Sequence, residues 1–309
     1  MHWRIKGTVQ KVLGHVPGGE HLHQALRRRF GGLADFGREC DSKVDDWRLM
    51  IGHLRDAHVA VGGATLLEIG TGWYPTFPCC LYLAGAERVH TLDIRPQLDG
   101  ELVHELADRP ASQVTMIARE AGRPPADVAA QQAELAAALA SGASLDEASG
   151  GVIVYRAPAD AAATGLPAGS VDVVFSNSVL EHMPLAGIEA CFAEARRVLR
   201  AGGVMFHSVN CGDHYAYIDS AIDQLHYLQF SEAEWARWNN AFLYQNRLRA
   251  ADFTAMARAA GFSIEIDTSR PSKERLAQLE KIEVDECFAR YPREQLAITS
   301  IDFVGRKPS

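Results

Sequence analysis

The chain has 309 residues, of which 47% are apolar and 23% are charged, which is the composition of an ordinary globular protein. At roughly 100–200 residues per domain, this length fits one large domain or two small ones. The 39 acidic and 31 basic residues give a formal net charge of −8 at pH 7. This charge argues against a dedicated DNA- or RNA-binding protein, because such proteins need a basic face.

The sequence predicts a cytoplasmic protein. No stretch approaches the roughly 18–20 continuous apolar residues that cross a bilayer, and Lys6, Gln10 and Lys11 interrupt what would be the apolar core of a signal peptide. The six cysteines show no C-x-x-C spacing, so we expect reduced thiols without disulfides or a zinc ribbon. The first thirty residues are amphipathic and basic, which leaves a peripheral membrane contact open beside simple packing on the body.

Residues 1–57 are expected to form an N-terminal helical lid, and residues 58–309 the main domain. Within the lid, apolar side chains of residues 44–54 recur at steps of three and four, which places them on one helix face. Ser42 with Asp45 three residues later is a capping-type pattern, and it predicts a helix start there.

Short apolar runs after residue 64 predict strands, and helical stretches such as 77–84 and 188–199 lie between most of them. Strands that alternate with helices predict a doubly wound parallel sheet of the α/β class. The last two runs have no clear helix between them, since residues 273–289 are charged and irregularly patterned. The predicted strands cover residues 65–69, 89–94, 152–156, 171–176, 203–209, 263–267 and 297–304.

Two connections are longer than a minimal α/β unit requires, at about residues 97–151 and 210–250. The first contains an alanine-rich segment, 126–140, with high helix propensity. The second carries Ser231 with Glu234, a capping box for a helix in its middle. We expect both insertions to be helical and to shape the substrate pocket.

A glycine turn follows the first predicted strand, as Gly70-Thr71-Gly72 comes directly after residues 65–69. The next strand ends in Asp93, where a carboxylate accepts hydrogen bonds from ribose hydroxyls in dinucleotide-binding folds. Pro75 stands at the closing position of G-x-G-x-x-G, which would receive a pyrophosphate. The pattern therefore favours a nucleoside without phosphates and disfavours a nicotinamide oxidoreductase.

These residues resemble the first motif of class I S-adenosylmethionine-dependent methyltransferases, usually E/D-x-G-x-G-x-G, with Tyr74 in place of the third glycine. Further segments resemble later motifs of that family in the family's order: residues 92–94, 155–161, 169–182 and 195–203. The resemblance implies a seven-stranded Rossmann-like sheet with a reversed last strand, and S-adenosylmethionine as cofactor. Trp73 and Tyr74 are expected either to form a wall of the site or to pack under the N-terminal helices.

The resemblance also implies which residues bind the cofactor. Asp93 would hold the ribose, Ile94 would pack on the adenine, and Glu68 would meet the amino group. The candidate cofactor-binding residues are Glu68, Gly70, Thr71, Gly72, Asp93, Ile94, Asp160, Ala161, Ser176, Asn177 and His182.

Residues 210–219 follow the fifth predicted strand directly, so they lie at the cofactor edge of the sheet. His214 is a candidate general base, because the ordinary pKa of histidine is roughly 6.5, and Asp213 is its candidate catalytic partner. Two alternatives remain: hydrogen bonds that pin the loop, or a metal site of Asp213 and His214 with Asp219 or His226. The spacing suits no standard zinc pattern and leaves only an octahedral, Mg-like site with few protein ligands, so we expect no metal. Candidate acceptor-binding residues are Asn210, Tyr215, Tyr217 and Arg247.

The expected function is methyl transfer from S-adenosylmethionine to a small-molecule or glycan acceptor, at a hydroxyl. Residues 213–249 resemble bacterial methyltransferases of surface-polysaccharide and secondary-metabolite pathways. Two alternatives use the same fold: an intramolecular cyclisation of the cofactor that releases methylthioadenosine, and a non-catalytic cofactor-binding partner. The sequence favours no nucleic-acid partner and leaves the oligomeric state open, with a homodimer as one option.

Overall fold

The computed structural model describes residues 2–16, 19, 22, 35–109, 111–240 and 242–309. Seven strands form one sheet in the order β3-β2-β1-β4-β5-β7-β6. Each strand coincides with a predicted apolar run, and the largest difference is the earlier start of β5. The strands are β1 Thr65–Ile69, β2 Arg88–Leu92, β3 Ile153–Arg156, β4 Val171–Asn177, β5 Leu199–Asn210, β6 Ser263–Asp267 and β7 Ser300–Arg306.

The sheet is parallel from β3 to β5, and β7 runs antiparallel to both of its neighbours, β5 and β6. This arrangement confirms the predicted doubly wound sheet with a reversed last strand. The central strand β1 is buried along almost its whole length, as expected of a strand covered by helices on both faces.

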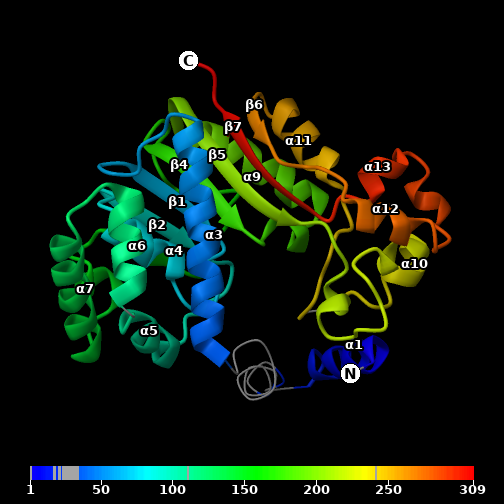
Figure 1. The fold of residues 1–309 in the computed structure, drawn as a ribbon, viewed down its shortest axis with the longest axis horizontal. Helices are drawn as coiled ribbons and strands as arrows, with labels where there is room; N and C mark the ends of the chain where they lie inside the picture. The colour runs from blue at the N-terminus through cyan, green and yellow to red at the C-terminus, as the bar shows by residue number, and fades with distance from the viewer. Residues whose placement is uncertain (1, 17–18, 20–21, 23–34, 110, 241) are drawn as a thin grey trace.

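Helices cover both faces of the sheet (Figure 1). Leu66 packs into the core on one face, under α3 Phe36–Asp56, α4 Thr76–Leu83 and α6 Ala111–Ala121. The next residue, Leu67, packs into the opposite core, under α9 Leu185–Val198 and α11 Ala250–Ala259. Successive side chains of a strand point to opposite faces, so one continuous apolar run fills both cores.

The two described helices before β1 pack in different places. The long helix α3 belongs to the sheet's core layer, because its residues Trp47, Met50 and Leu54 are fully buried there. By contrast, α1 Trp3–Leu13 packs on the second insertion, where the Trp3 ring lies 4.6 Å from that of Trp238. Residues 17–18, 20–21 and 23–34 of the predicted lid lie outside the described residues.

The predicted helix start at Ser42 is wrong. The helix begins at Phe36, and the carboxylate of Asp35 caps it by accepting a hydrogen bond from Arg38 N at 3.2 Å. Ser42 and Asp45 are both exposed inside the helix. A serine followed by an acidic residue is also common on a solvated helix face, so the pattern alone did not locate the cap.

Both insertions are helical, as predicted. The first contains α5 Gly100–Ala107, α6, α7 Pro125–Ala140 and α8 Leu145–Ala148, and α7 packs against α5 and α6. The second contains η3 His214–Tyr217, η4 His226–Gln229 and α10 Glu232–Trp235. The predicted capping box of Ser231 and Glu234 is present at the start of α10.

The segment between β6 and β7 contains short helices that the irregular sequence pattern did not predict: α12 Lys273–Leu279, η5 Glu286–Phe288 and α13 Arg293–Leu296. Their apolar residues Leu279, Phe288 and Leu296 share a core with Trp3 and Tyr227. This separate core joins α1, the second insertion and the β6–β7 connection, at one side of the molecule (Figure 1).

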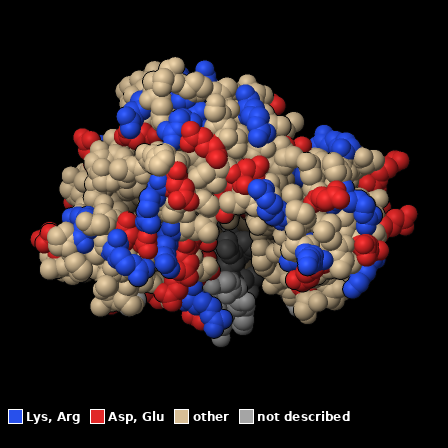
Figure 2. Space-filling view, turned by 45° about the horizontal axis from the view of Figure 1, so that its top comes forward, with Lys and Arg blue, Asp and Glu red and all other residues tan. Residues whose placement is uncertain are grey.

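All six cysteines are free thiols, and five of them are buried. Among the described residues, no helix has the length and apolar character needed to cross a membrane. On the face drawn in Figure 2, basic and acidic side chains lie interspersed among uncharged ones.

Candidate cofactor and acceptor site

A cavity of about 710 Å³ lies at the carboxyl ends of β1, β2 and β4. Parallel doubly wound sheets bind their ligands at this edge. Ten of the eleven predicted cofactor-binding residues line the cavity: Glu68, Gly70, Thr71, Gly72, Asp93, Ile94, Asp160, Ala161, Asn177 and His182.

The glycine turn forms one wall of the cavity, and its conformation requires glycine. Gly70 and Gly72 have positive φ angles of 82° and 73°. A Cβ atom at Gly70 would lie 2.5 Å from Cγ2 of Val179. Gly72 N donates a hydrogen bond of 2.9 Å to the carboxylate of Asp93, which ties the turn to the end of β2. The backbone therefore approaches the cavity closely, as the sequence predicts.

Glu68 is buried at the base of the cavity. Its carboxylate accepts a hydrogen bond from the hydroxyl of Thr91, which in turn is hydrogen-bonded to Thr71. Burial raises the pKa of Glu68 to about 8, while the Thr91 hydrogen bond and the charge of Lys43 act in the opposite direction. A buried carboxyl at this position is suited to pairing with a cationic group of a ligand, because such a group restores its charged form.

The outer part of the cavity presents groups that suit a nucleoside. Ile94 lines it, yet 74% of this residue is exposed, which is unusual for a large aliphatic side chain. A flat apolar ring seated on Ile94 would bury that surface. Asp93 lies beside it and, through its other carboxylate oxygen, accepts a hydrogen bond of 3.2 Å from Arg95 N. The residues present therefore fit a ribose and an adenine ring.

The sequence did not predict that α3 would contribute to this cavity. Glu39 and Lys43, one turn apart on that helix, both line it. Glu39 accepts a hydrogen bond of 2.7 Å from the hydroxyl of Tyr74, and Lys43 donates one of 2.5 Å to Asn177. A polar pair at i and i+4 along the edge of the buried stripe of residues 44–54 was the only available signal. Trp73 and Tyr74 line the cavity as well, so they do form part of its wall.

Ser176 is the one predicted cofactor residue that lies elsewhere. Its hydroxyl is fully buried and hydrogen-bonded to Nδ1 of His207 at 2.7 Å. Residues in a strand alternate between faces. Asn177, the next residue, is therefore the one that reaches the cavity, and Ser176 belongs to the core.

Two predicted acceptor-binding residues are also structural. The Tyr215 hydroxyl donates to Trp238 O at 3.0 Å, and its ring packs on Trp3. The buried guanidinium of Arg247 donates to the carbonyl oxygens of Tyr227 and Phe230, at 3.0 and 2.5 Å. Both residues stabilise the second insertion, because their side chains make contacts within its own core, which is separate from the sheet.

Asp213 pins the loop and does not orient His214. It is fully buried; one carboxylate oxygen accepts from Tyr215 N and the other contacts Nδ1 of His226, each at 2.8 Å. Asp219 accepts hydrogen bonds from Trp3 N and Ala221 N. The acidic residues considered for a metal site with His214 are thus used in hydrogen bonds within the loop.

A second, smaller cavity of about 260 Å³ adjoins the first at Ser178, which lines both. The predicted residues Asn210 and Tyr217 line it, and the Asn210 amide donates to the Tyr217 hydroxyl at 2.5 Å. Of the eight lining residues, all except Val209 carry a hydroxyl or an amide: Ser178, Ser208, Asn210, Tyr217, Gln224, Thr299 and Ser300.

His214 lies close to this boundary, with its ring 4.9 Å from that of His182 and 5.7 Å from that of Tyr217. Burial lowers the pKa of His214 to about 3. A general base works best when its pKa is near the operating pH, so His214 alone is a weak base. The buried Glu181 beside it has a pKa raised to about 7, again mainly by burial.

Residues 125–207, from α7 to the middle of β5, match a family model described as a methyltransferase domain. This match covers about a quarter of the chain, and together with the strand order it supports the predicted class I S-adenosylmethionine-dependent methyltransferase. It likewise supports S-adenosylmethionine as the cofactor, and Glu68, Asp93 and Ile94 are the residues present that suit its amino group, ribose and adenine.

Solved structures of methyltransferases resemble this chain at low sequence identity. A candidate sarcosine dimethylglycine methyltransferase from Galdieria sulphuraria is 16% identical, with 88% of each chain covered and a TM-score of 0.48. A methyltransferase from Mesorhizobium loti is 17% identical, with 83% of this chain and 96% of that chain covered and a TM-score of 0.44. Geranyl diphosphate C-methyltransferase from Streptomyces coelicolor A3(2) is 12% identical, with 84% and 78% covered and a TM-score of 0.44. No curated protein matches the sequence.

Proposed function

We propose that this domain methylates a hydroxyl group of a small-molecule or glycan acceptor. The observation that carries the proposal is the second cavity, whose lining is almost entirely hydroxyl and amide groups. Uncharged donors and acceptors of this kind recognise polyhydroxylated ligands through hydrogen bonds. An aromatic hydrocarbon would instead leave these groups unpaired, and a charged acceptor would find no counter-ion among the lining residues.

The two cavities meet at Ser178, so an acceptor in the smaller one reaches toward the larger one. Ser178 has a φ of 55°, a conformation that few residues other than glycine adopt, and it immediately follows β4. This turn keeps the side chain of Val179 against Gly70. The protein's main contribution is thus to align the two ligands.

When bound, S-adenosylmethionine supplies a methyl group on a sulfonium, and its C–S bond breaks as the new O–C bond forms. The acceptor hydroxyl loses its proton in this step, to water or to an ionisable side chain beside the larger cavity. Glu181, His182 and His214 cluster there, and His182 lines that cavity. The Asn210 and Tyr217 pair, held by its own hydrogen bond, would orient the acceptor for in-line attack.

The test is product analysis with pools of hydroxylated acceptors, sugars and phenols among them, and matched pools of amines. We expect S-adenosylhomocysteine and a product 14 mass units heavier, methylated on oxygen, from the hydroxyl pools only. Asn210→Ala should raise the KM for the acceptor at unchanged cofactor affinity, while Gln229→Ala, outside the cavity lining, should not. Methylation of amines alone would contradict the proposal. Methylthioadenosine formed without any acceptor would instead support the cyclisation.

A further inference from the structure

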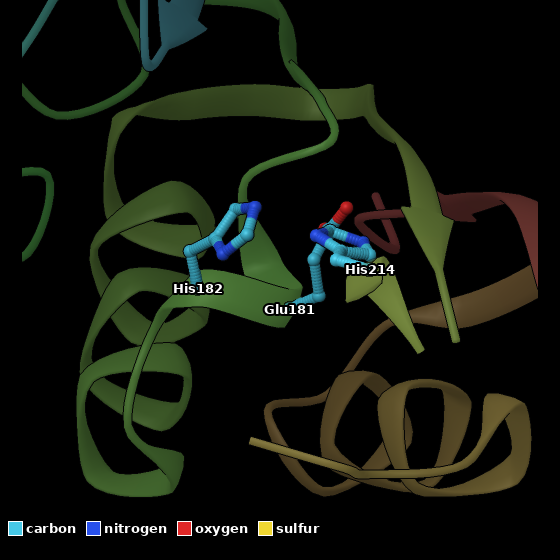
Figure 3. A group of neighbouring side chains, drawn as sticks. All are labelled: Glu181, His182 and His214. Atoms are coloured by element: carbon cyan, nitrogen blue, oxygen red, sulfur yellow. The ribbon is translucent and has the colours of Figure 1, made fainter. Parts of the chain in front are cut away.

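Glu181, His182 and His214 form a cluster of potential metal ligands beside the larger cavity, which His182 lines. One carboxylate oxygen and one nitrogen from each imidazole all lie within 4.8 Å of one another. Glu181 and His182 come from η2 Leu180–His182, directly after β4, and His214 starts η3, directly after β5. Figure 3 shows the Glu181 side chain beside the His214 ring, with the His182 ring on the other side.

Two atoms of this cluster are buried without a hydrogen-bond partner. They are Oε2 of Glu181 and Nε2 of His214. Only 1% of Glu181 is exposed, and burying an unpaired carboxylate oxygen and ring nitrogen is unfavourable. Nearly all such buried atoms in folded proteins have a partner in the protein, in water or in an ion. The two unpaired atoms therefore indicate a ligand that binds between them.

The surrounding contacts orient the three side chains as ligands. His182 Nδ1 lies 2.6 Å from the carbonyl oxygen of Tyr244, so this nitrogen carries the proton and donates it, and Nε2 keeps its lone pair. Such a bond to a carbonyl is the usual support of a metal-binding histidine. The other carboxylate oxygen of Glu181 accepts from Asn210 N at 3.3 Å, so Oε2 is the oxygen left without a partner.

Basic side chains near the cluster would oppose a bound cation. Two lysines act on the cluster electrostatically, Lys43 on Glu181 and Lys6 on His214. Lys43 is itself engaged by Asn177 and, at 3.6 Å, by Asp46, which offsets part of its charge.

We propose that Glu181, His182 and His214 bind one divalent transition-metal ion of the zinc and iron class. Two imidazoles and one carboxylate are the ligand set of many catalytic zinc and non-haem iron sites, and soft thiolates are absent from the cluster. Ligands of one ion lie roughly 3–3.5 Å apart, so the three atoms, which lie within 4.8 Å of one another, would close to that spacing when the ion binds.

Three protein ligands leave at least one coordination position open. An oxygen of the acceptor can occupy it, and the ion then lowers the pKa of that hydroxyl. This role rests on the proposed function, and it removes the need for a strong base among the three residues. Metal binding itself is independent of the acceptor, so the two proposals fail separately.

The test is metal binding by the full chain, first stripped with EDTA and then titrated with Co²⁺, whose visible absorption reports its ligands. Competition with Zn²⁺ in the same titration gives the affinity for Zn²⁺. We expect one ion per chain for the unmodified protein. Glu181→Gln, His182→Ala and His214→Ala should each weaken binding at least tenfold, whereas His104→Ala, an exposed histidine on α5, should leave it unchanged.

Melting temperature and S-adenosylhomocysteine binding check that each variant is folded. The exposed His182 is the decisive position, because its loss is the least disruptive to packing. The proposal would be overturned if the unmodified protein bound no stoichiometric Co²⁺ or Zn²⁺, or if all three variants still bound the metal. An ordered water would then be the partner of the unpaired Glu181 and His214 atoms.

Discussion

Lys43 Nζ donates a hydrogen bond of 2.5 Å to Oδ1 of Asn177, and so joins a helix before the sheet to the end of β4 inside the cofactor cavity. The same ammonium lowers the pKa of Glu68 through its charge. One side chain of α3 therefore acts on two of the residues that face the cofactor. This contact makes α3 part of the binding site as well as part of the core.

Replacing Lys43 should weaken cofactor binding. In Lys43→Met the carboxyl of Glu68 is protonated to a larger extent at pH 7, and Asn177 loses its partner. We expect the affinity for S-adenosylhomocysteine to fall roughly 3- to 10-fold. This change in binding free energy is the size expected for the loss of one electrostatic contact. Isothermal titration calorimetry measures it. Arg48→Met, on the same helix but paired with the surface residue Glu120, is the control. Equal affinities in both variants would rule out this role.

Glu68 should make stability depend on pH. Burial raises its pKa from 4.5 to about 8, so the folded chain holds this proton more tightly than the unfolded chain. The resulting stabilisation is complete below about pH 4.5 and is lost as the pH rises to about 8. Glu68→Gln cannot ionise and should gain melting temperature relative to the unmodified protein between pH 5 and 8. Glu134→Gln, exposed on α7, should show no such trend.

A difference between Glu68→Gln and the unmodified protein that stays constant across this pH range would show that Glu68 does not titrate there. Cofactor binding provides a second check. If the amino group of the cofactor meets the charged carboxylate, binding near pH 7 should release a proton. Calorimetry in buffers of different ionisation enthalpy detects that proton.

Ile94 should contribute to binding and not to folding. Because 74% of it is exposed in the free protein, Ile94→Ala should leave the melting temperature within about 1 °C. Burial of its side chain under the adenine is worth roughly 1–2 kcal/mol, so the affinity for S-adenosylhomocysteine should fall about 5- to 30-fold. Leu49→Ala, an exposed leucine on α3, is the matched control. A loss of stability without a loss of affinity would contradict the placement of adenine.

Asp93 should be the strongest single determinant of ribose binding. Asp93→Ala removes a charge-assisted hydrogen bond, and we expect a loss of roughly 1.5–3 kcal/mol in cofactor binding. Part of this loss would come from the glycine turn, because Gly72 N loses its acceptor. Calorimetric titration of the variant beside Asp127→Ala, on the exposed face of α7, measures the effect. Unchanged affinity would place the ribose elsewhere.

Asp213 should be important for stability. Its carboxylate is fully buried and makes hydrogen bonds with Tyr215 N and His226. Asp213→Ala leaves both groups unpaired, so we expect a loss of roughly 2–4 kcal/mol in the free energy of unfolding. Urea denaturation compares it with Asp45→Ala, an exposed position on α3. A variant of normal stability but impaired turnover would return Asp213 to a catalytic role.

The sequence predicted the sheet well because buried parallel strands are continuous apolar runs, such as residues 65–69 and 263–267, bounded by turns. It also predicted ten residues that line the larger cavity, since the glycine turn and Asp93 follow strands directly and their positions depend on short-range geometry. The same logic failed at Ser176, because alternation along β4 decides which of two adjacent polar residues faces the cavity.

The acceptor side was less predictable for a different reason. In the second insertion, Asp213 and Arg247 are polar residues that satisfy backbone groups of a small separate core, which no periodic pattern reveals. The neighbours of Glu181 come from two different strand ends, and only the three-dimensional structure brings His214 to them. Lys43 was missed because its helix was expected to lie over the site and not beside it.

The reversal of β7 has a practical consequence. Because this strand runs opposite to β4 and β5, it carries the chain away from the edge where the ligands bind, and Figure 1 shows its end on the far side of the molecule from α1. A peptide fused after Ser309 would therefore leave both cavities unobstructed. Anchoring the protein to a solid support through that end should preserve access for bulky acceptors, whereas a fusion before Trp3 would crowd the aromatic cluster beneath the second insertion.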